Sequence, residues 1–214
     1  MKRIGYFRYP AVLMICVLSA GCASPNRGLP GIAYDPGASR SLRFKVNYFY
    51  QAVDQGSFKP FTDGAVLHSG DHYQIQFTPR EDSYVYIFQI DSHQGVYQLF
   101  PMESFKGVQL DNRNPVQAGM TYTLPTENAA FQLDDQTGRE TLYFMASRRP
   151  DRILEDQYAA LSQARQEQRA SLVEQLQEQL NQSIKTRGLA KVVPNLAQDA
   201  RRAERVSVIT FEHR

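Results

Sequence analysis

Residues 68–101 constrain the fold most, because they hold three short runs rich in β-branched and aromatic residues, with turn residues between them. In the first run, Tyr73, Ile75 and Phe77 occupy every second position, so a strand places their side chains on one face. The second run, residues 83–90, is apolar at nearly every position, which is typical of a strand buried on both faces. We therefore expect a β-domain with residues 83–90 as its central strand.

Further short runs on both sides extend this pattern. Alternation predicts a first strand over residues 43–50. More strands are expected over residues 119–124, 130–133 and 140–146, with turn residues but no helix between them. A last alternating run, residues 205–211, predicts a closing C-terminal strand that returns to the sheet. Together these runs predict a mainly β fold, either an antiparallel β-sandwich or a barrel-like domain.

An ordered set of turn and strand residues over about residues 42–150 carries a family resemblance. The set comprises Gly70, Asp71, Phe77, the run from Asp82 to Phe88, Asp91, Gly95, Val96, Leu99, Phe100, Pro101, Asn114, Pro115, Val116, Ala118, Gly119, Tyr122, Leu124, Pro125, Phe131, Gly138, Arg139, Glu140, Ala146 and Ser147. In this order and spacing it resembles the family known as domain of unknown function 4384. The resemblance implies a β-rich module that occurs alone in bacterial lipoproteins or attached to protease-like and kinase-like domains. That family has no agreed catalytic residues to transfer.

The composition changes after Pro150 and becomes rich in Ala, Gln, Glu, Arg and Leu up to Gly188. Pro and Asp before this segment and Gly at its end predict a long helix over residues 151–188, followed by a loop and the closing strand over residues 189–214.

An apolar stripe on this helix predicts what the helix packs against. Its members recur at helical spacing and are Leu154, Tyr158, Leu161, Leu172, Leu176 and Leu180. Arg165, Gln168 and Arg169 interrupt the stripe, so either the helix bends there or its middle turns leave the sheet. We expect the helix to pack on its own sandwich; the alternative, a coiled-coil dimer, lacks a sustained heptad repeat.

Residues 1–21 have the pattern of a secretory signal peptide. Basic residues come first, and the apolar run over residues 11–20 is too short to span a bilayer. The sequence from Leu18 to Cys22, Leu-Ser-Ala-Gly-Cys, resembles a bacterial lipobox. We expect the Cys22 thiol to take a diacylglycerol, the leader to be cut before it and the new amine to be acylated. An ordinary secretory leader with a chance cysteine is the alternative.

Several acyl chains on Cys22 would make a lasting anchor in the lipid bilayer, since each buried methylene contributes about 0.8 kcal/mol. Ala23 follows the cysteine, and by resemblance to lipoprotein sorting in Gram-negative bacteria this favours the outer membrane. Residues 22–41, broken by Pro and Gly, predict a flexible tether that could reach about 60 Å when extended. We expect a cell-envelope protein anchored in the outer membrane and facing the periplasm.

Composition after processing excludes several function classes. Without the three basic residues of the leader, 21 basic residues face 22 acidic ones, and the formal charge falls from +2 to −1. This gives no support for a nucleic-acid-binding surface. Cys16 lies in the leader and Cys22 would be lipidated, so cysteine catalysis and cysteine metal sites are excluded.

One cluster has metal-capable side chains, namely His68, Asp71 and His72. Zinc requires three or four ligands, and His93 and His213 lie at no motif spacing from this cluster. We expect Gly70 and Asp71 to form a turn with solvated histidines, and we expect neither a metal nor a cofactor.

Catalytic patterns receive no support from the sequence. Five carboxylates could be paired for acid-base chemistry, but they sit at loop positions rich in Gly, Asn and Ser; they are Asp82, Asp91, Asp111, Asp134 and Asp135. The sequence has neither a Gly-x-Ser-x-Gly elbow nor a glycine-rich phosphate loop. We therefore expect a protein that is not an enzyme.

The leading hypothesis is a lipid-anchored binding module of the bacterial envelope, with another envelope protein or a glycan as its partner. Pairing through a sandwich edge is one physical way to bind. The alternative is an accessory or regulatory subunit of a separately encoded envelope enzyme or secretion machine. A third hypothesis is an envelope hydrolase that uses Asp71 or His72. The sequence leaves the oligomeric state open.

Overall fold

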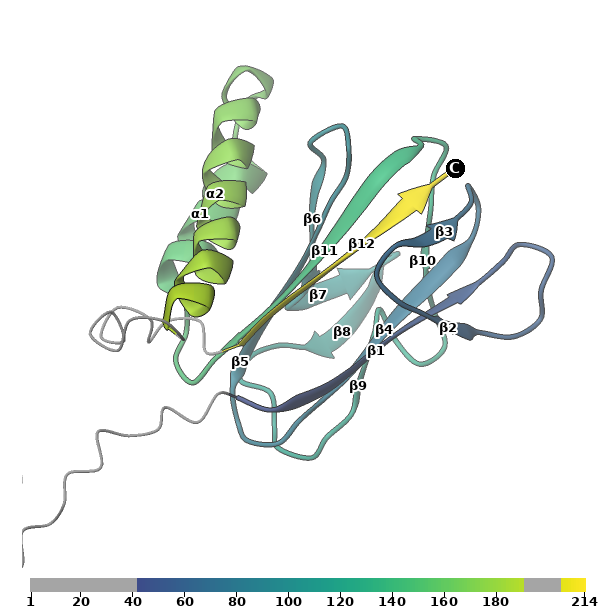
Figure 1. Cartoon of the computed structure of the whole chain (residues 1–214), viewed down its shortest axis with the longest axis horizontal. Coiled ribbons are helices and arrows are strands. Elements are labelled where there is room, and N and C mark those ends of the chain that lie inside the picture. Colours follow the sequence, from purple (N-terminus) through teal and green to yellow (C-terminus); the bar gives the residue numbers. More distant parts are fainter. Residues whose placement is uncertain (1–41, 191–204) are drawn as a thin grey trace, which may run out of the picture. The chain divides into compact units, whose positions relative to one another are not determined.

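The structure is a computed structural model that describes residues 42–190 and 205–214. The predicted leader, residues 1–21, the predicted tether, residues 22–41, and most of the predicted loop before the closing strand lie outside the described residues. The described part forms layers, with two helices on the outer face of one sheet and a second sheet on that sheet's inner face (Figure 1).

The sheet that lies away from the helices, called sheet A, is antiparallel throughout. Its strands are β1 (Phe44–Gln51), β2 (Lys59–Phe61), β4 (His72–Pro79), β9 (Tyr122–Leu124) and β10 (Phe131–Gln132). The strand order is β10-β4-β1-β2, and β9 also pairs with β4. The predicted first strand and the strands after residue 119 are therefore confirmed.

The sheet under the helices, called sheet B, contains the predicted central and closing strands. Its strands are β3 (Ala65–Leu67), β5 (Tyr84–Ile90), β6 (Val96–Phe100), β11 (Gly138–Ser147) and β12 (Arg205–His213), in the order β3-β12-β11-β5-β6. All neighbours are antiparallel except β3 and β12, which run parallel. The closing strand thus lies inside the sheet. Both sheets are open, so the fold is a sandwich and not a closed barrel.

The core between the sheets follows the predicted alternation. Tyr73, Ile75 and Phe77 of β4 are all buried on the inner face of sheet A. Strand β5 is buried on both faces, because Ile87 joins the core between the sheets while Phe88 packs under the helices. Aromatic rings dominate this core, where Phe77 lies edge-on to Phe100 and Phe144.

The C-terminal helical segment consists of two helices, α1 (Arg152–Gln163) and α2 (Gln166–Ala190), and not one continuous helix. The chain becomes extended at Ala164, with ψ 143°, next to the arginine that interrupts the apolar stripe. Asp151 caps α1 by accepting a hydrogen bond from the Leu154 N–H. No helix in the described part of the chain has the length and apolar character needed to cross a membrane.

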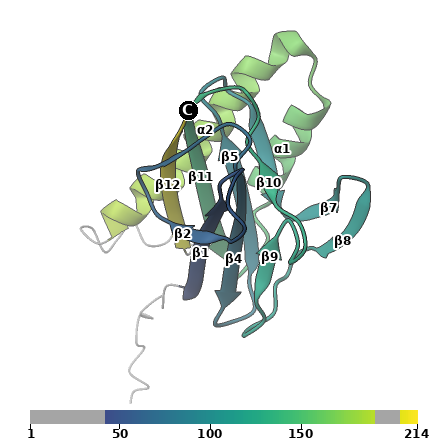
Figure 2. The same ribbon diagram turned by 90° about the vertical axis from the view of Figure 1, so that its right-hand side faces the viewer.

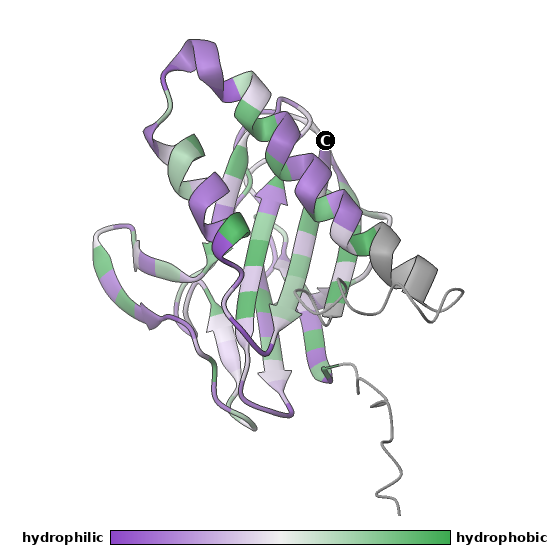
Figure 3. Ribbon diagram, turned by 90° about the vertical axis from the view of Figure 1, so that its left-hand side faces the viewer, coloured by the Kyte–Doolittle hydropathy of each residue, from purple (hydrophilic) through white to green (hydrophobic). Residues whose placement is uncertain are grey.

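Both helices lie across the outer face of sheet B, as Figure 3 shows. The buried side chains of this layer are Leu154, Leu161, Val173, Leu176 and Leu180, which pack on Tyr86, Phe88, Tyr143 and Met145 of the sheet. Fully burying one such leucine contributes about 1.5–3 kcal/mol. The prediction that the helical segment packs on its own sandwich is confirmed.

A hairpin that the sequence did not predict, β7 (Met102–Phe105) and β8 (Val108–Asn112), forms a separate two-stranded sheet. Its turn residues Lys106 and Gly107 have φ values of 48° and 81°, as a two-residue type I′ turn requires. Met102 and Phe105 pack against the core. This packing holds the hairpin beside sheet A, near β9 and β10 (Figure 2).

Candidate functional site

The three predicted metal candidates take different roles. The buried Asp71 carboxylate accepts hydrogen bonds from the N–H groups of Val53, at 3.2 Å, and His68, at 2.9 Å, so it holds the turn before β4. The His68 side chain is 68% exposed, with its Nδ1 3.8 Å from Asp71. His72 lies on the outer face of sheet A, among the residues that line a pocket described below. Within residues 42–190 and 205–214, no three His, Cys, Asp or Glu side chains gather to hold a metal ion.

The loop carboxylates stabilise turns. Asp91 accepts hydrogen bonds from the N–H groups of His93 and Gly95 in the β5–β6 turn, at 2.8 and 2.7 Å. Asp82 accepts one from Ala118, and Asp134 accepts one from Gln136. Of the other two, Asp111 pairs with Arg113 and Asp135 is exposed. Four of these five side chains thus accept hydrogen bonds from backbone N–H groups or pair with a neighbouring cation, as aspartates that stabilise turns do.

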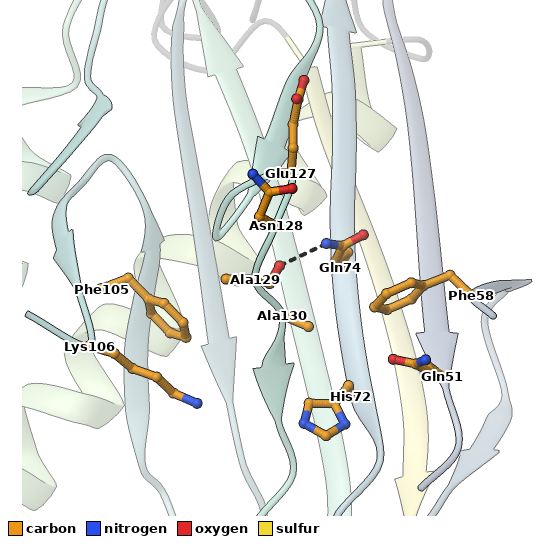
Figure 4. A pocket seen from close by; sticks show the side chains of 10 residues that line it. All are labelled: Gln51, Phe58, His72, Gln74, Phe105, Lys106, Glu127, Asn128, Ala129 and Ala130. Carbon is orange, nitrogen blue, oxygen red and sulfur yellow. Dashed lines mark hydrogen bonds between the residues drawn. The ribbon is translucent and has the colours of Figure 1, made fainter. Parts of the chain in front are cut away.

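A pocket of about 440 Å³ lies over the outer face of sheet A. Its floor is polar because Gln51, His72 and Gln74 alternate along β1 and β4 with side chains that enter the core. Phe58 stands on one side of this floor and Phe105, with the neighbouring lysine, on the other (Figure 4).

The segment between β9 and β10 borders this pocket and is held by hydrogen bonds from a side chain of β4. The Gln74 Nε2 donates a hydrogen bond to the carbonyl oxygen of Ala129, at 2.7 Å (Figure 4). It donates a second one to the carbonyl oxygen of Thr126, at 3.2 Å, so the segment is tied to β4. The pocket therefore has a rigid border, because this amide is itself held on a central strand.

A second pocket, of about 650 Å³, lies between β8 and the segment that contains β9. Phe105, Lys106 and residues 127–129 line both pockets, so the two adjoin. We call them together the hairpin groove. Its volume falls in the range of ligand-binding sites, about 300–1,000 Å³ for one pocket.

The hairpin groove is amphipathic. Phe105, Leu110 and Tyr122 are partly buried along the second pocket, and Tyr122 stacks on Phe77 with ring centroids 5.1 Å apart. At the rim, Phe58 is 37% exposed and Val108 is 62% exposed. Exposed apolar side chains beside amides and hydroxyls are typical of interaction surfaces.

The charges that line the second pocket are mixed. Lys106 is cationic, whereas Asp111 and Glu127 are anionic, and Arg113 pairs with Asp111 beside the pocket. The hairpin groove therefore has no strong field of one sign, and it does not favour a highly charged ligand.

A second cluster of polar side chains forms a buried network that shares no residue with the lining of the groove. Gln89 Nε2 donates to Glu140 Oε2 at 2.8 Å, and the Tyr73 hydroxyl donates to Gln89. His213 Nδ1 lies 3.7 Å from Glu140 Oε1, and His213 Nε2 lies 3.1 Å from the Ser69 hydroxyl. Burial raises the pKa of Glu140, as do the charges of nearby aspartates, while the Gln89 hydrogen bond and His213 lower it.

This network places a serine, a histidine and a glutamate in the order of a catalytic triad, but two features of its surroundings do not fit such a site. The N–H groups of Ser69 and Gly70 donate to the carbonyls of Arg214 and Leu133, both at 2.9 Å, so neither is available as an oxyanion donor. His213 is only 2% exposed. Sequence reasoning missed the network, although its glutamate falls at an inward position of β11, a signal that a charged residue is buried there.

Comparison with known families gives one match. Residues 66–150 match the model of the family described as domain of unknown function (DUF4384). We call this matched segment, residues 66–150, the DUF4384 domain. The match confirms the resemblance for the segment from β3 to the start of the helical segment, whereas β1 and β2 precede it. No curated protein and no solved structure matches the chain.

Several residues that carry the resemblance support the DUF4384 domain's own backbone. Gly95 leaves no room for a side chain, since a Cβ there would lie 2.3 Å from the Asp91 carboxylate. Asn114 bonds the backbone of β5, and the Tyr122 hydroxyl accepts the Gln117 N–H. By contrast, the β7–β8 hairpin contains none of the residues on which the resemblance rests.

Proposed function

We propose that this chain is a lipid-anchored bacterial envelope protein whose DUF4384 domain acts as a non-enzymatic binding module. Cys22 would hold it in the outer membrane, and residues 22–41 would let the domain reach a partner on the periplasmic side. The partner is another envelope component, a protein or a glycan. The observation that carries the binding role is the hairpin groove, in which a fixed polar floor adjoins a partly exposed aromatic wall.

The placement of the groove supports this role. Helices cover the outer face of sheet B, whereas the hairpin groove lies on the outer face and edge of sheet A. Its borders come from well-packed elements, since Phe105 lies edge-on to Phe131 with centroids 5.5 Å apart. A concave surface on a rigid scaffold loses little conformational entropy on binding.

Site-specific photocrosslinking in intact cells tests the binding role. A photoreactive amino acid replaces Gln109, an exposed residue of β8 that lines the groove. The matched control replaces Val66, which is 42% exposed on β3 in the other sheet. We expect one recurring envelope component to be crosslinked from position 109 and not from position 66. Equal products from both positions, or none from position 109, would contradict the proposal.

The identity of the crosslinked component distinguishes two possible roles of the binding module. A recurring subunit of an enzyme or secretion machine would assign the chain an accessory role in that machine. Retention on peptidoglycan or another glycan would assign it a role in holding envelope layers together.

The anchor has its own test. Cys22→Ser removes the thiol that would be lipidated, so the variant should leave the membrane fraction or accumulate with its leader uncleaved. Ser19→Ala, which keeps a small residue before the cysteine, serves as the control and should fractionate as the original chain does. An unchanged membrane fraction for Cys22→Ser would reject the anchor.

A further inference from the structure

Two strand edges border the second pocket of the hairpin groove without pairing to each other. β8 pairs only with β7, and β9 pairs only with β4, among the residues that the structure describes. No backbone hydrogen bond joins β8 to β9 in this part of the chain. Each strand therefore presents one row of backbone donors and acceptors that no other strand occupies.

Two other edges of the sandwich, at β6 and β2, are less open to strand addition. At the edge of sheet B, the Gln98 N–H of β6 donates to the Tyr158 hydroxyl of α1, at 3.3 Å. At one edge of sheet A, β2 contains Lys59 and Pro60, which oppose pairing. In contrast, β9 contains neither a charged residue nor a proline. The β9 edge is thus chemically open to an added strand.

The side chains beside these edges alternate, which indicates the chemistry of an added strand. Tyr122 stacks on the core, whereas its neighbours Thr121 and Thr123 belong to the outer face, where they bond Thr78 and Gln76. A strand laid along β9 would place every second side chain over Tyr122 and Leu110, and the others beside the threonines. The first set should be apolar and the second set small and polar.

We propose that the hairpin groove binds an extended, uncharged segment of a partner protein, which adds as a β-strand between β8 and β9. This inference rests on the proposed binding function and names its mode. Backbone hydrogen bonds to both edges hold the segment, and the apolar side chains that line the second pocket select its alternate side chains. The mixed charges around the groove leave little electrostatic preference, so the segment is neutral.

Amide hydrogen exchange on the full chain in detergent tests the mode. The probes are short capped peptides that alternate Thr with Val, Ile, Leu or Phe. With a peptide at about ten times its Kd, exchange of the protected amides should slow about tenfold. We expect this slowing in residues 108–112 and 121–125, and no change in β2 or β3. If no peptide slows exchange in those two segments, the proposal is wrong.

The matched control peptides carry N-methyl groups on every second backbone nitrogen. They keep the side chains but lose the donors on one side of the strand, so they should give no slowing. Equal slowing by the methylated peptides would show that only side chains bind, and it would overturn strand addition. This control does not depend on any protein variant.

A pair of protein variants locates the site. Leu110→Glu places a charge among the apolar side chains of the second pocket and should abolish the slowing. Val66→Glu makes the same change on the exposed edge strand β3 and should leave it intact. If the peptides no longer slow exchange in either variant, or still slow it in both, the site is not the second pocket of the groove.

Failure of this mode can be told apart from failure of the binding function. If crosslinking from position 109 identifies a partner but no alternating peptide slows exchange, the binding function stands and strand addition falls. If soluble peptidoglycan fragments slow exchange in the groove and the peptides do not, the ligand is a glycan and strand addition is again overturned.

Discussion

The side-chain amide of Asn114 forms two hydrogen bonds with the backbone of Val85, at the start of the central strand β5. The Val85 N–H donates to Asn114 Oδ1 at 2.9 Å, and Asn114 Nδ2 donates to the Val85 carbonyl at 2.8 Å. The pairing of β5 with β6 ends at Ile87, so the amide takes the place of a neighbouring strand beyond that point. A residue of the family resemblance thus completes the sheet.

Replacing this amide should destabilise the fold. Asn114→Ala leaves a donor and an acceptor of β5 without partners, and we expect the free energy of unfolding to fall by about 1–3 kcal/mol. Asn128→Ala, at an exposed position of the groove, should change it by less than about 0.5 kcal/mol. Urea unfolding measures both variants. Equal stability of the two would mean that the Asn114 bonds contribute nothing.

The Tyr86 hydroxyl joins sheet B to the start of α1. It donates to Glu155 Oε1 at 2.6 Å and accepts the Asp151 N–H at 2.9 Å. Burial and the Glu155 carboxylate raise the pKa of Tyr86, so the hydroxyl stays protonated as a donor. Tyr86→Phe should lower the free energy of unfolding by about 1.5–3 kcal/mol, the range for a bond to a charged group.

Amide hydrogen exchange shows where Tyr86→Phe destabilises the protein. Loss of the Tyr86 hydroxyl should speed exchange in α1, residues 152–163, more than in the strands of sheet B. Tyr97→Phe is the matched control because Tyr97 is 49% exposed. If Tyr97→Phe speeds exchange in α1 as much as Tyr86→Phe does, the hydroxyl of Tyr86 does not hold α1 on the sheet.

Two adjacent residues of α1 differ in burial, so replacing each with alanine should lower the free energy of unfolding by different amounts. Leu154 is fully buried between α1 and sheet B, whereas Ile153 is 37% exposed. Leu154→Ala should cost about 2–5 kcal/mol because it leaves a cavity. Ile153→Ala should cost less than about 1 kcal/mol. Thermal and urea unfolding compare them, and similar costs would contradict the packing of α1 on sheet B.

The buried carboxyl of Glu140 predicts a dependence of stability on pH. Because its pKa is raised in the folded state, its contribution is fully present below the ordinary glutamate pKa of about 4.3 and is lost as the pH rises. Glu140→Gln cannot ionise. The free energy of unfolding of the variant relative to the original chain should therefore increase between about pH 4 and 7, by at most about 1.4 kcal/mol per pH unit.

Urea unfolding at several pH values measures this difference. Glu103→Gln, at an exposed position of β7, should show no such trend. A difference that falls as the pH rises would show that the ionised carboxylate is stabilised, and the Nδ1 of His213 lies 3.7 Å from this carboxylate.

Much of the sandwich could be predicted because its strands obey local rules. The alternation of Tyr73, Ile75 and Phe77 and the continuous apolar run of β5 depend only on which faces are buried. The β7–β8 hairpin could not be predicted from its turn, since Lys106-Gly107 is not the Asn-Gly or Asp-Gly pair that usually marks a type I′ turn. Strand β2 was missed because it is short and contains a proline.

The candidate site could not be predicted because it depends on tertiary structure. The hairpin groove brings together β1, β4, the hairpin and residues 121–129, which only the sheet order places side by side. Likewise, Glu140 and His213 meet through the register of β11 with β12, which no local pattern encodes.

In the proposed function, lipidation of Cys22 would determine both where the domain works and which partners it can reach. The intact mass of the mature protein extracted from membranes tests it most directly. We predict a mass equal to residues 22–214 plus acyl chains, found in the outer-membrane fraction. A mass without acyl chains, found in the soluble fraction, would contradict the claim that this binding module is anchored in the envelope.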